Sequence, residues 1–180
     1  MHEHCFHGDI ASLRSPERLV WLDVYRVVEL SLQDGDFRRV LDIGTGSGIF
    51  AEAFSRAGRE VIGADANPRM LEAARGLVPS VRFEEGTAES PPFPDASCDL
   101  VFIGLRLLET DDYLQTMREA TRVTQRRMSA LEWPYKEQEF GSGLDERLAE
   151  KQVKDLAAQA GLKVKCFLPL QSLVLYLLER

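Results

Sequence analysis

The sequence predicts an α/β fold built on a doubly wound, mostly parallel sheet of about seven strands whose last strand runs antiparallel. From residue 40 onward, short apolar runs alternate with stretches of helical spacing, which is the pattern of strand and helix units. The runs are apolar throughout, as expected of strands covered on both faces. Only residues 169–172 separate the last two runs, too few for a crossover helix, so these runs are predicted to form an antiparallel hairpin.

The first helix is predicted to begin at Ser15 and Pro16. Serine caps helix starts and proline suits the first helical position. The helix is expected to run to the break at residues 34–36, with one apolar face made of Leu19, Leu22, Tyr25, Val28 and Leu32.

Five apolar runs then predict five strands, with helices after four of them. The runs are residues 40–43, 61–64, 81–83, 100–103 and 128–133. A further helix is expected from about residue 144 to 160, closed by Gly161. The terminal hairpin is expected to consist of residues 162–168 and 173–178.

Length and composition indicate a single domain over residues 1–180. Hydrophobic residues make up 44% and charged residues 28%, which excludes disordered and collagen-like chains. The formal net charge of -7 makes a nucleic-acid partner unlikely. Three scattered cysteines, no signal-peptide pattern and no apolar window of membrane-spanning length predict a cytoplasmic protein without a membrane span.

The strongest chemical signal is the glycine-rich turn of residues 44–48, which follows a buried strand and opens a helix. Its glycines allow a ligand close to the backbone, and the N–H groups at the helix start attract negative charge. Asp65 ends the second strand 21 positions after Gly44, where a carboxylate can accept hydrogen bonds from ribose hydroxyls. The third glycine is Gly48, one position early for a dinucleotide fingerprint, and no P-loop lysine follows. A tight turn without a ligand is the alternative, but Asp65 favours a nucleoside-containing ligand.

Three segments resemble a known family. Residues 42–48 (Asp-Ile-Gly-Thr-Gly-Ser-Gly) resemble the first motif of class I S-adenosylmethionine-dependent methyltransferases, in particular the methyltransferase type 11 and ubiquinone/menaquinone-biosynthesis type. Residues 65–71 match the second motif, and residues 86–101 are similar to the third and fourth. The resemblance implies a Rossmann-like fold with S-adenosylmethionine as cofactor and S-adenosylhomocysteine as product. It divides the domain into an N-terminal segment and helix (1–35), a cofactor-binding half (36–133) and an acceptor-side loop, helix and hairpin (134–180).

The resemblance also implies cofactor roles for the matching positions. The glycine turn and Asp42 would receive the methionine part, Asp65 the ribose hydroxyls, and the backbone N–H of Ala88 an adenine nitrogen. Thr87 stands where the family usually has Asp, so an uncharged hydroxyl would replace a charged contact to the adenine amino group. The predicted cofactor residues are Asp42, Gly44, Thr45, Gly46, Gly48, Asp65, Ala66, Met70, Thr87, Ala88 and Glu89.

The acceptor is expected in the loops after the fourth and fifth strands, because ligands of open α/β sheets bind outside the carboxyl ends of the strands. Arg106 and Glu109 follow the fourth strand and are either substrate ligands or a solvated helix start. Trp133, Tyr135 and Phe140 follow the fifth and either line an acceptor pocket or bury the sheet edge. The predicted substrate residues are Arg106, Glu109, Trp133 and Tyr135.

The predicted function is methyl transfer from S-adenosylmethionine to a small-molecule acceptor. Relatives often have His where Leu108 stands, so no catalytic base is assigned. One alternative is a methyltransferase-like protein that binds S-adenosylmethionine or S-adenosylhomocysteine without turnover, motivated by Thr87 and Leu108. Another is a nucleotide-sugar or nicotinamide enzyme.

No metal site is predicted. His2, His4, Cys5 and His7 bunch side chains that can bind transition metals, but no second ligand pair follows them in the sequence.

Overall fold

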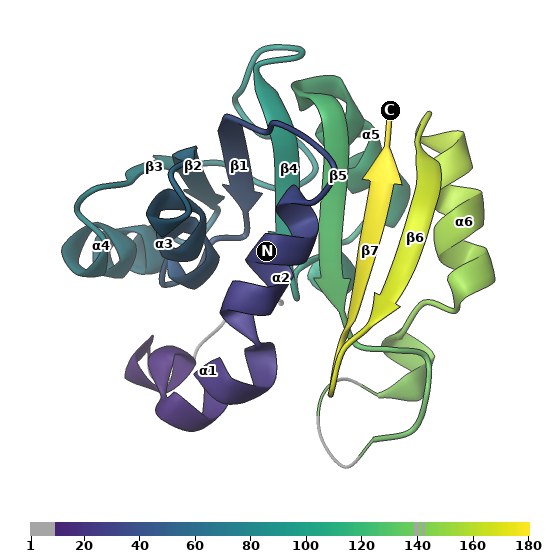
Figure 1. Cartoon of the computed structure of the whole chain (residues 1–180), viewed down its shortest axis with the longest axis horizontal. Coiled ribbons are helices and arrows are strands. Elements are labelled where there is room, and N and C mark those ends of the chain that lie inside the picture. Colours follow the sequence, from purple (N-terminus) through teal and green to yellow (C-terminus); the bar gives the residue numbers. More distant parts are fainter. Residues whose placement is uncertain (1–9, 139–140, 142) are drawn as a thin grey trace.

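The computed structural model describes residues 10–138, 141 and 143–180. Its centre is a seven-stranded sheet in the order β3-β2-β1-β4-β5-β7-β6 (Figure 1). The strands are β1 (Arg39–Ile43), β2 (Glu60–Asp65), β3 (Arg82–Glu85), β4 (Cys98–Gly104), β5 (Thr124–Glu132), β6 (Lys163–Pro169) and β7 (Val174–Glu179). Strand β7 is antiparallel to both of its neighbours, whereas the other pairings are parallel. The predicted fold class and terminal hairpin are confirmed.

Helices cover both faces of the sheet. They are α1 (Pro16–Leu22), α2 (Val24–Leu32), α3 (Ile49–Arg56), α4 (Pro68–Leu77), α5 (Tyr113–Val123) and α6 (Glu150–Gln159), with short 3₁₀ helices η1 (Ile10–Arg14), η2 (Leu107–Glu109) and η3 (Leu144–Glu146). Buried residues of α2, α3 and α4 share one core with the sheet, and those of α5 and α6 share a second core on its other face (Figure 1). Within the described residues, none of these helices has the length and apolar character needed to cross a bilayer.

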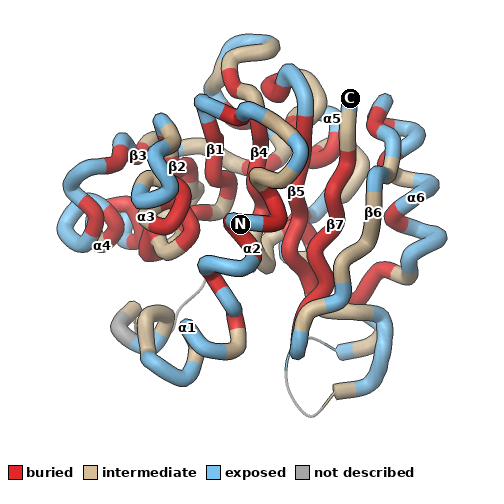
Figure 2. Tube along the Cα trace, viewed as in Figure 1, coloured by how far each residue is buried: buried red, intermediate tan, exposed pale blue. Residues whose placement is uncertain are grey.

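The strands are buried because their side chains alternate between two apolar layers. In β4, Leu100 and Phe102 belong to the core beneath α2 and α3, whereas Val101 and Ile103 belong to the core beneath α5. Figure 2 shows the central strands as buried and the outer sides of the helices as exposed. This burial on both faces explains why the strands appear in the sequence as continuous apolar runs.

The N-terminal helix differs from its prediction, because it is two helices. Ser15 does cap α1, its Oγ accepting a hydrogen bond from the Arg18 N–H at 3.3 Å. The helix then ends at Asp23, which adopts a left-handed conformation (φ 47°) from which α2 starts in a new direction. The predicted single apolar face is therefore wrong: Leu22 is buried in the core, but Tyr25 is 68% exposed.

Strand β5 begins at Thr124, four residues before the predicted start at 128. The added residues are polar, yet Arg127 is only 1% exposed. Its guanidinium donates hydrogen bonds to the carbonyl oxygens of Ser31 and Gln33 at 3.0 and 2.7 Å and pairs with Glu179 at 2.7 Å. These partners from α2, its following turn and β7 allow an arginine inside the sheet layer.

The predicted helix from residue 144 is also shorter than expected. Only the single turn η3 forms there, and α6 begins at Glu150. Between them Arg147 is extended (ψ 147°) and buried. Its side chain donates to the carbonyl oxygen of Pro134 at 3.1 Å and to Oε1 of Gln138 at 2.9 Å, so it ties this segment to the chain that follows β5.

Candidate functional site

The glycine-rich turn connects β1 to α3 at the carboxyl edge of the sheet. Gly44, Gly46 and Gly48 all have positive φ, at 70°, 54° and 78°. These values lie in the left-handed region that favours glycine. The N–H groups of Gly44 and Thr45 both donate to the carbonyl oxygen of Ala64 at the end of β2, at 2.8 and 3.0 Å. The turn is thereby fixed against the neighbouring strand.

The surroundings of two glycines differ. A Cβ atom on Gly44 would lie 2.5 Å from Cγ of Arg106, whose side-chain stem therefore covers this part of the backbone. A Cβ atom on Gly46 would meet nothing within 4 Å. The backbone at Gly46 is therefore open to a ligand, whereas that at Gly44 is covered by a flexible side chain.

Asp42 lies in β1 beneath the turn and is only 2% exposed. Its Oδ2 accepts a hydrogen bond from the Thr45 hydroxyl at 2.7 Å. Burial raises the pKa of Asp42 to about 7, against the hydrogen bonds from Thr45 and from the Ala51 N–H, which favour the charged form. Asp42 therefore changes its charge near neutral pH.

Asp65 joins the second predicted motif to the first. It ends β2, which pairs in parallel with β1, as its predicted position beside the first strand requires. Its Oδ2 accepts a hydrogen bond from the N–H of Gly46 at 2.9 Å, and its Oδ1 accepts one from Asn67 at 2.9 Å. Asp65 is partly exposed, so unused lone pairs of the carboxylate remain available to hydroxyl groups.

A cavity of about 130 Å³ lies over the turn. Five predicted cofactor residues line it, together with the predicted substrate residues Arg106 and Glu109, which pair with each other at 2.7 Å. The N-terminal segment also lines it through Leu13, Arg18 and Leu22. The five cofactor residues are Asp42, Gly44, Thr45, Gly46 and Asp65.

The N-terminal segment is attached to the turn by Arg14. Its guanidinium donates to the carbonyl oxygen of Ser47 from Nη2 at 2.9 Å and pairs with Glu52 of α3 at 2.7 Å. Both partners belong to the turn and the first part of α3, so η1 and the start of α1 are held over the glycine turn.

Six predicted cofactor residues do not line this cavity: Gly48, Ala66, Met70, Thr87, Ala88 and Glu89. Met70 and Ala88 are buried, and Ala66 is partly exposed beside Asp65. Thr87 forms an isolated β-bridge with Ser90. Oε1 of Glu89 accepts a hydrogen bond from the N–H of Asp111 at 3.1 Å, which joins the loop after β3 to the loop after β4.

A second cavity, of about 600 Å³, lies beside η2 and shares Leu105 and Glu109 with the first. Trp133 lines it and also stacks on Trp21, with ring centroids 5.3 Å apart. Tyr135 is 53% exposed and is not among its lining residues. Phe140, the third aromatic residue of the sequence prediction, lies outside the described residues.

Glu132 at the end of β5 was not predicted as a site residue, yet it lines the second cavity. It is 2% exposed, and its Oε1 accepts hydrogen bonds from the N–H groups of Leu107 and Leu108 at 2.8 and 3.4 Å. Burial raises the pKa of Glu132 to about 8. The sequence signal that could have found it is an acid at the end of an apolar strand, which for Asp65 was combined with its position 21 residues after Gly44.

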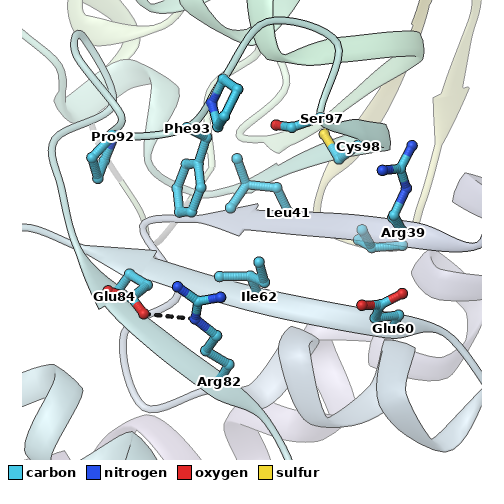
Figure 3. A pocket seen from close by; sticks show the side chains of 12 residues that line it. Arg39, Leu41, Glu60, Ile62, Arg82, Glu84, Pro92, Phe93, Ser97 and Cys98 are labelled. Atoms are coloured by element: carbon cyan, nitrogen blue, oxygen red, sulfur yellow. Dashed lines mark hydrogen bonds and ion pairs between the residues drawn. The ribbon is translucent and has the colours of Figure 1, made fainter.

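A third hollow, of about 320 Å³, lies away from the glycine turn (Figure 3). The crossover from β3 to β4 contains no helix, and Phe93 of this crossover packs against the core on that face of the sheet. In Figure 3, Leu41 and Ile62 face Phe93, and Arg82 pairs with Glu84 at the rim. The hollow extends to Arg39 at the start of β1, the strand end opposite the glycine turn, and none of the predicted cofactor residues lines it.

Within the described residues, no group of three or more His, Cys, Asp or Glu side chains is arranged to hold a metal ion. The cluster of His2, His4, Cys5 and His7 lies outside those residues.

Comparisons with known proteins agree with the motifs. Residues 40–127 match the family described as "Methyltransferase domain". The chain is 44% identical over 90 residues to the uncharacterized methyltransferase YcgJ of Bacillus subtilis, covering 47% of this chain and 36% of that protein. It is 45% identical over 92 residues to a demethylmenaquinone methyltransferase of Deinococcus radiodurans, covering 48% of this chain and 38% of that protein. The chain thus matches little more than a third of the length of these relatives.

The fold matches over a longer stretch. A solved SAM-dependent methyltransferase from Aquifex aeolicus superposes with a TM-score of 0.83 at 23% identity, covering 94% of this chain and 96% of that one. At this identity the likeness shows the fold alone, and it places the matched segment within the Rossmann-like sheet predicted from the sequence. Residues 40–127 are therefore a methyltransferase domain on a class I, Rossmann-like fold, which confirms the predicted family resemblance.

Proposed function

We propose that this chain binds S-adenosylmethionine at the glycine turn and transfers its methyl group to a small-molecule acceptor. S-adenosylmethionine is the methyl donor of this class of methyltransferase. The proposal depends chiefly on one observation: the carboxylate of Asp65 contacts the open backbone at Gly46 at 2.9 Å. A sugar-binding acid and a bare glycine backbone thereby form one surface, which suits a ligand that joins a ribose to a charged amino-acid chain.

In this arrangement Asp65 accepts hydrogen bonds from the ribose hydroxyls. The amino group of the methionine part lies over the turn, where Asp42 and Thr45 supply oxygen atoms. The adenine lies toward the loop after β3, among the remaining predicted cofactor residues Ala66, Met70, Thr87, Ala88 and Glu89. Because these five residues come from α4, the turn before it and the loop after β3, cofactor binding would also order the carboxyl edge of the sheet.

Binding of the whole cofactor requires some side chains to move. The cavity over the turn holds about 130 Å³, whereas small-molecule sites typically have about 300–1,000 Å³. The stem of Arg106 lies on Gly44 and is the nearest obstacle. We infer that Arg106, together with the N-terminal segment around Arg18, shifts when the methionine part binds.

The chemistry that the protein must supply is mainly alignment. Methyl transfer is an in-line displacement at carbon, so its rate depends on holding the acceptor atom close to the methyl group and opposite the sulfur. The cavity of about 600 Å³ that adjoins the turn has the size of a small-molecule site. A small acceptor also agrees with the demethylmenaquinone methyltransferases among the relatives and with the net charge of -7, which disfavours nucleic acid.

The same proposal includes a cytoplasmic location and action as one unit over residues 1–180. The three scattered cysteines favour this location. Action as one unit is supported by the two adjoining cavities, which the N-terminal segment, the glycine turn and the chain after β5 line together.

Calorimetric titration of the protein with S-adenosylhomocysteine tests the cofactor assignment. The wild type should bind, and Asp65→Ala should bind about 10- to 100-fold more weakly, because charge-assisted hydrogen bonds contribute about 1.5–3 kcal/mol each. The exposed acid Asp155 is the matched control, and Asp155→Ala should leave the affinity unchanged.

Absence of binding by a folded wild-type protein would refute the proposal, and tight binding of NAD instead would favour a nicotinamide enzyme. Binding without methyl release for any acceptor in a panel would favour a binding protein without turnover.

A further inference from the structure

The cavity of about 600 Å³ lies where a methyl acceptor has to bind if the proposed function holds. It shares Leu105 and Glu109 with the cavity over the glycine turn. An acceptor atom must approach the methyl group directly, so the space adjoining the donor site is the acceptor site.

The charged lining of this cavity is acidic throughout. Within the described part of the chain its charged residues are Glu109, Asp111, Glu132, Asp145 and Glu146, and no Lys, Arg or His is among the lining residues. The neighbouring guanidinium of Arg106 is paired with Glu109 at 2.7 Å. Such a lining repels carboxylates and phosphates and attracts a cation.

Glu132 is the innermost of these acids. Its side chain is buried, and its Oε1 accepts hydrogen bonds from the N–H groups of Leu107 and Leu108. In the same described set no ion pair reaches it. Burying a carboxylate without a positively charged partner raises the free energy of the folded protein, so a cation in the cavity would supply the missing positive charge.

In the part of the chain that the structure describes, the groups that face Glu132 supply no positive charge either. Burial raises the pKa of Glu132 to about 8, and the charge of Glu109 raises it as well, whereas the backbone N–H groups of Leu107, Leu108 and Trp133 lower it. Tyr176 of β7 faces it too, and its own pKa is raised by burial and by Glu132. No facing group is positively charged among those that shift these values.

The rest of the lining is largely apolar. Leu105 and Leu108 contribute aliphatic surface, and Tyr113 and Trp133 contribute rings. A ligand that fits both parts of the lining has an apolar body and a basic nitrogen.

We propose that the methyl acceptor is an amine, bound in this cavity as its ammonium ion, and that Glu132 is both its counter-ion and its proton acceptor. This inference rests on the proposed methyltransferase function. An N–H proton passes from the ammonium group to the Glu132 carboxylate, which frees the nitrogen lone pair. That pair forms the new N–C bond to the methyl group, and the C–S bonding pair stays on sulfur. The products are S-adenosylhomocysteine and a methylated ammonium ion.

Three probes of similar shape and different charge test the proposal: benzylammonium, benzyl alcohol and benzoate. Each is titrated calorimetrically into the full chain saturated with S-adenosylhomocysteine. We expect benzylammonium to bind at least about tenfold more tightly than benzyl alcohol, and benzoate to bind most weakly. Equal affinities for the three probes would overturn the proposal.

A variant assigns the effect to one carboxylate. Glu132→Gln should lower the affinity for benzylammonium about tenfold or more and leave the affinity for benzyl alcohol unchanged. Glu72→Gln is the control, because Glu72 is an exposed acid of α4 outside the lining of the cavity. Unchanged benzylammonium affinity in Glu132→Gln would refute the role of Glu132.

The pH profile separates this role from a structural one. Benzyltrimethylammonium carries a permanent charge, so its affinity should rise by about fivefold or more between pH 6 and pH 9 as Glu132 ionises, and this rise should disappear in Glu132→Gln. If Glu132→Gln does not fold, the wild-type probe order and pH profile still decide the question. Failure to bind S-adenosylhomocysteine would refute the proposed function itself, whereas binding it without a preference for cations would refute only the amine proposal.

Discussion

Replacing Asp42 with Asn is expected to stabilise the fold increasingly as the pH rises. Burial raises the pKa of Asp42 from 3.8 to about 7, so the folded state holds this proton more tightly than the unfolded state. The stability that comes from the protonated carboxyl is fully present below about pH 4 and is lost as the pH rises to about 7. An asparagine carries no charge at any pH and removes this loss.

The structure supports the substitution sterically and chemically. Asp42 accepts from the Thr45 hydroxyl at 2.7 Å and from the Ala51 N–H. The asparagine oxygen can keep the Ala51 bond while its amide group donates to the hydroxyl of Thr45, which is able to accept. At 1.36 kcal/mol for each pKa unit, the full effect is about 4 kcal/mol, of which about 2–3 kcal/mol develops between pH 5 and pH 8.

Urea denaturation of the wild type and Asp42→Asn at about pH 5, 6, 7 and 8 measures this difference in the free energy of unfolding. Subtracting the wild-type value from that of the variant at each pH removes the contribution of Glu132, because Glu132 is present in both proteins. The exposed Asp155→Asn is the control and should show no pH-dependent difference. A difference between wild type and Asp42→Asn that stays constant across this range would refute the reasoning.

Three further predictions concern stability and reactivity. Gly58→Ala should lower the free energy of unfolding by about 1 kcal/mol through its positive φ alone, because a Cβ there meets nothing within 4 Å. Gly44→Ala should lower it further, because its Cβ would lie 2.5 Å from an arginine carbon. Equal losses for the two variants in urea denaturation would contradict this. In the same measurement Arg127→Ala should lower the free energy of unfolding by about 3–5 kcal/mol, and Arg126→Ala, at an exposed position, by less than about 1 kcal/mol. The reverse order would contradict a stabilising role for the buried hydrogen bonds of Arg127. Burial raises the pKa of Cys98 to about 12, so little of the reactive thiolate is present at pH 8. Mass spectrometry of the native protein treated with a disulfide reagent at pH 8 should therefore find Cys98 unlabelled. Rapid labelling of the native protein would disprove this.

The sequence was most informative about the strands. Each run whose apolar residues alternate between two cores appears as an uninterrupted apolar segment, so β1, β2 and β4 could be located within a residue or two. The break at Asp23 could not, because a left-handed aspartate in a helical pattern has no local signal and depends on packing around α1 and α2. The early part of β5 was missed for a similar reason, since only Glu179 and carbonyls distant in sequence make Arg127 a buried residue.

The candidate site also has a part that the sequence predicts and a part that it does not. The contact between Gly46 and Asp65 was predictable, because strands joined by one helix in a parallel sheet place their carboxyl ends side by side. The position of Arg106 on Gly44 was not, because the two residues belong to loops 62 positions apart in the chain and meet only through the pairing of β1 with β4. Glu132 was overlooked because a single acid after an apolar run is equally typical of a solvent-facing strand end.

The placement of β7 between β5 and β6 constrains how the molecule can assemble. Since β7 follows every other strand in the chain, the outer edge of β5 has no partner during synthesis until β7 has left the ribosome. A chain halted before that point would expose a buried-type strand to pairing with other chains. In the finished sheet the edge on this side belongs to β6, where exposed Lys163 and Lys165 and a register shift between Val164 and Cys166 discourage such pairing.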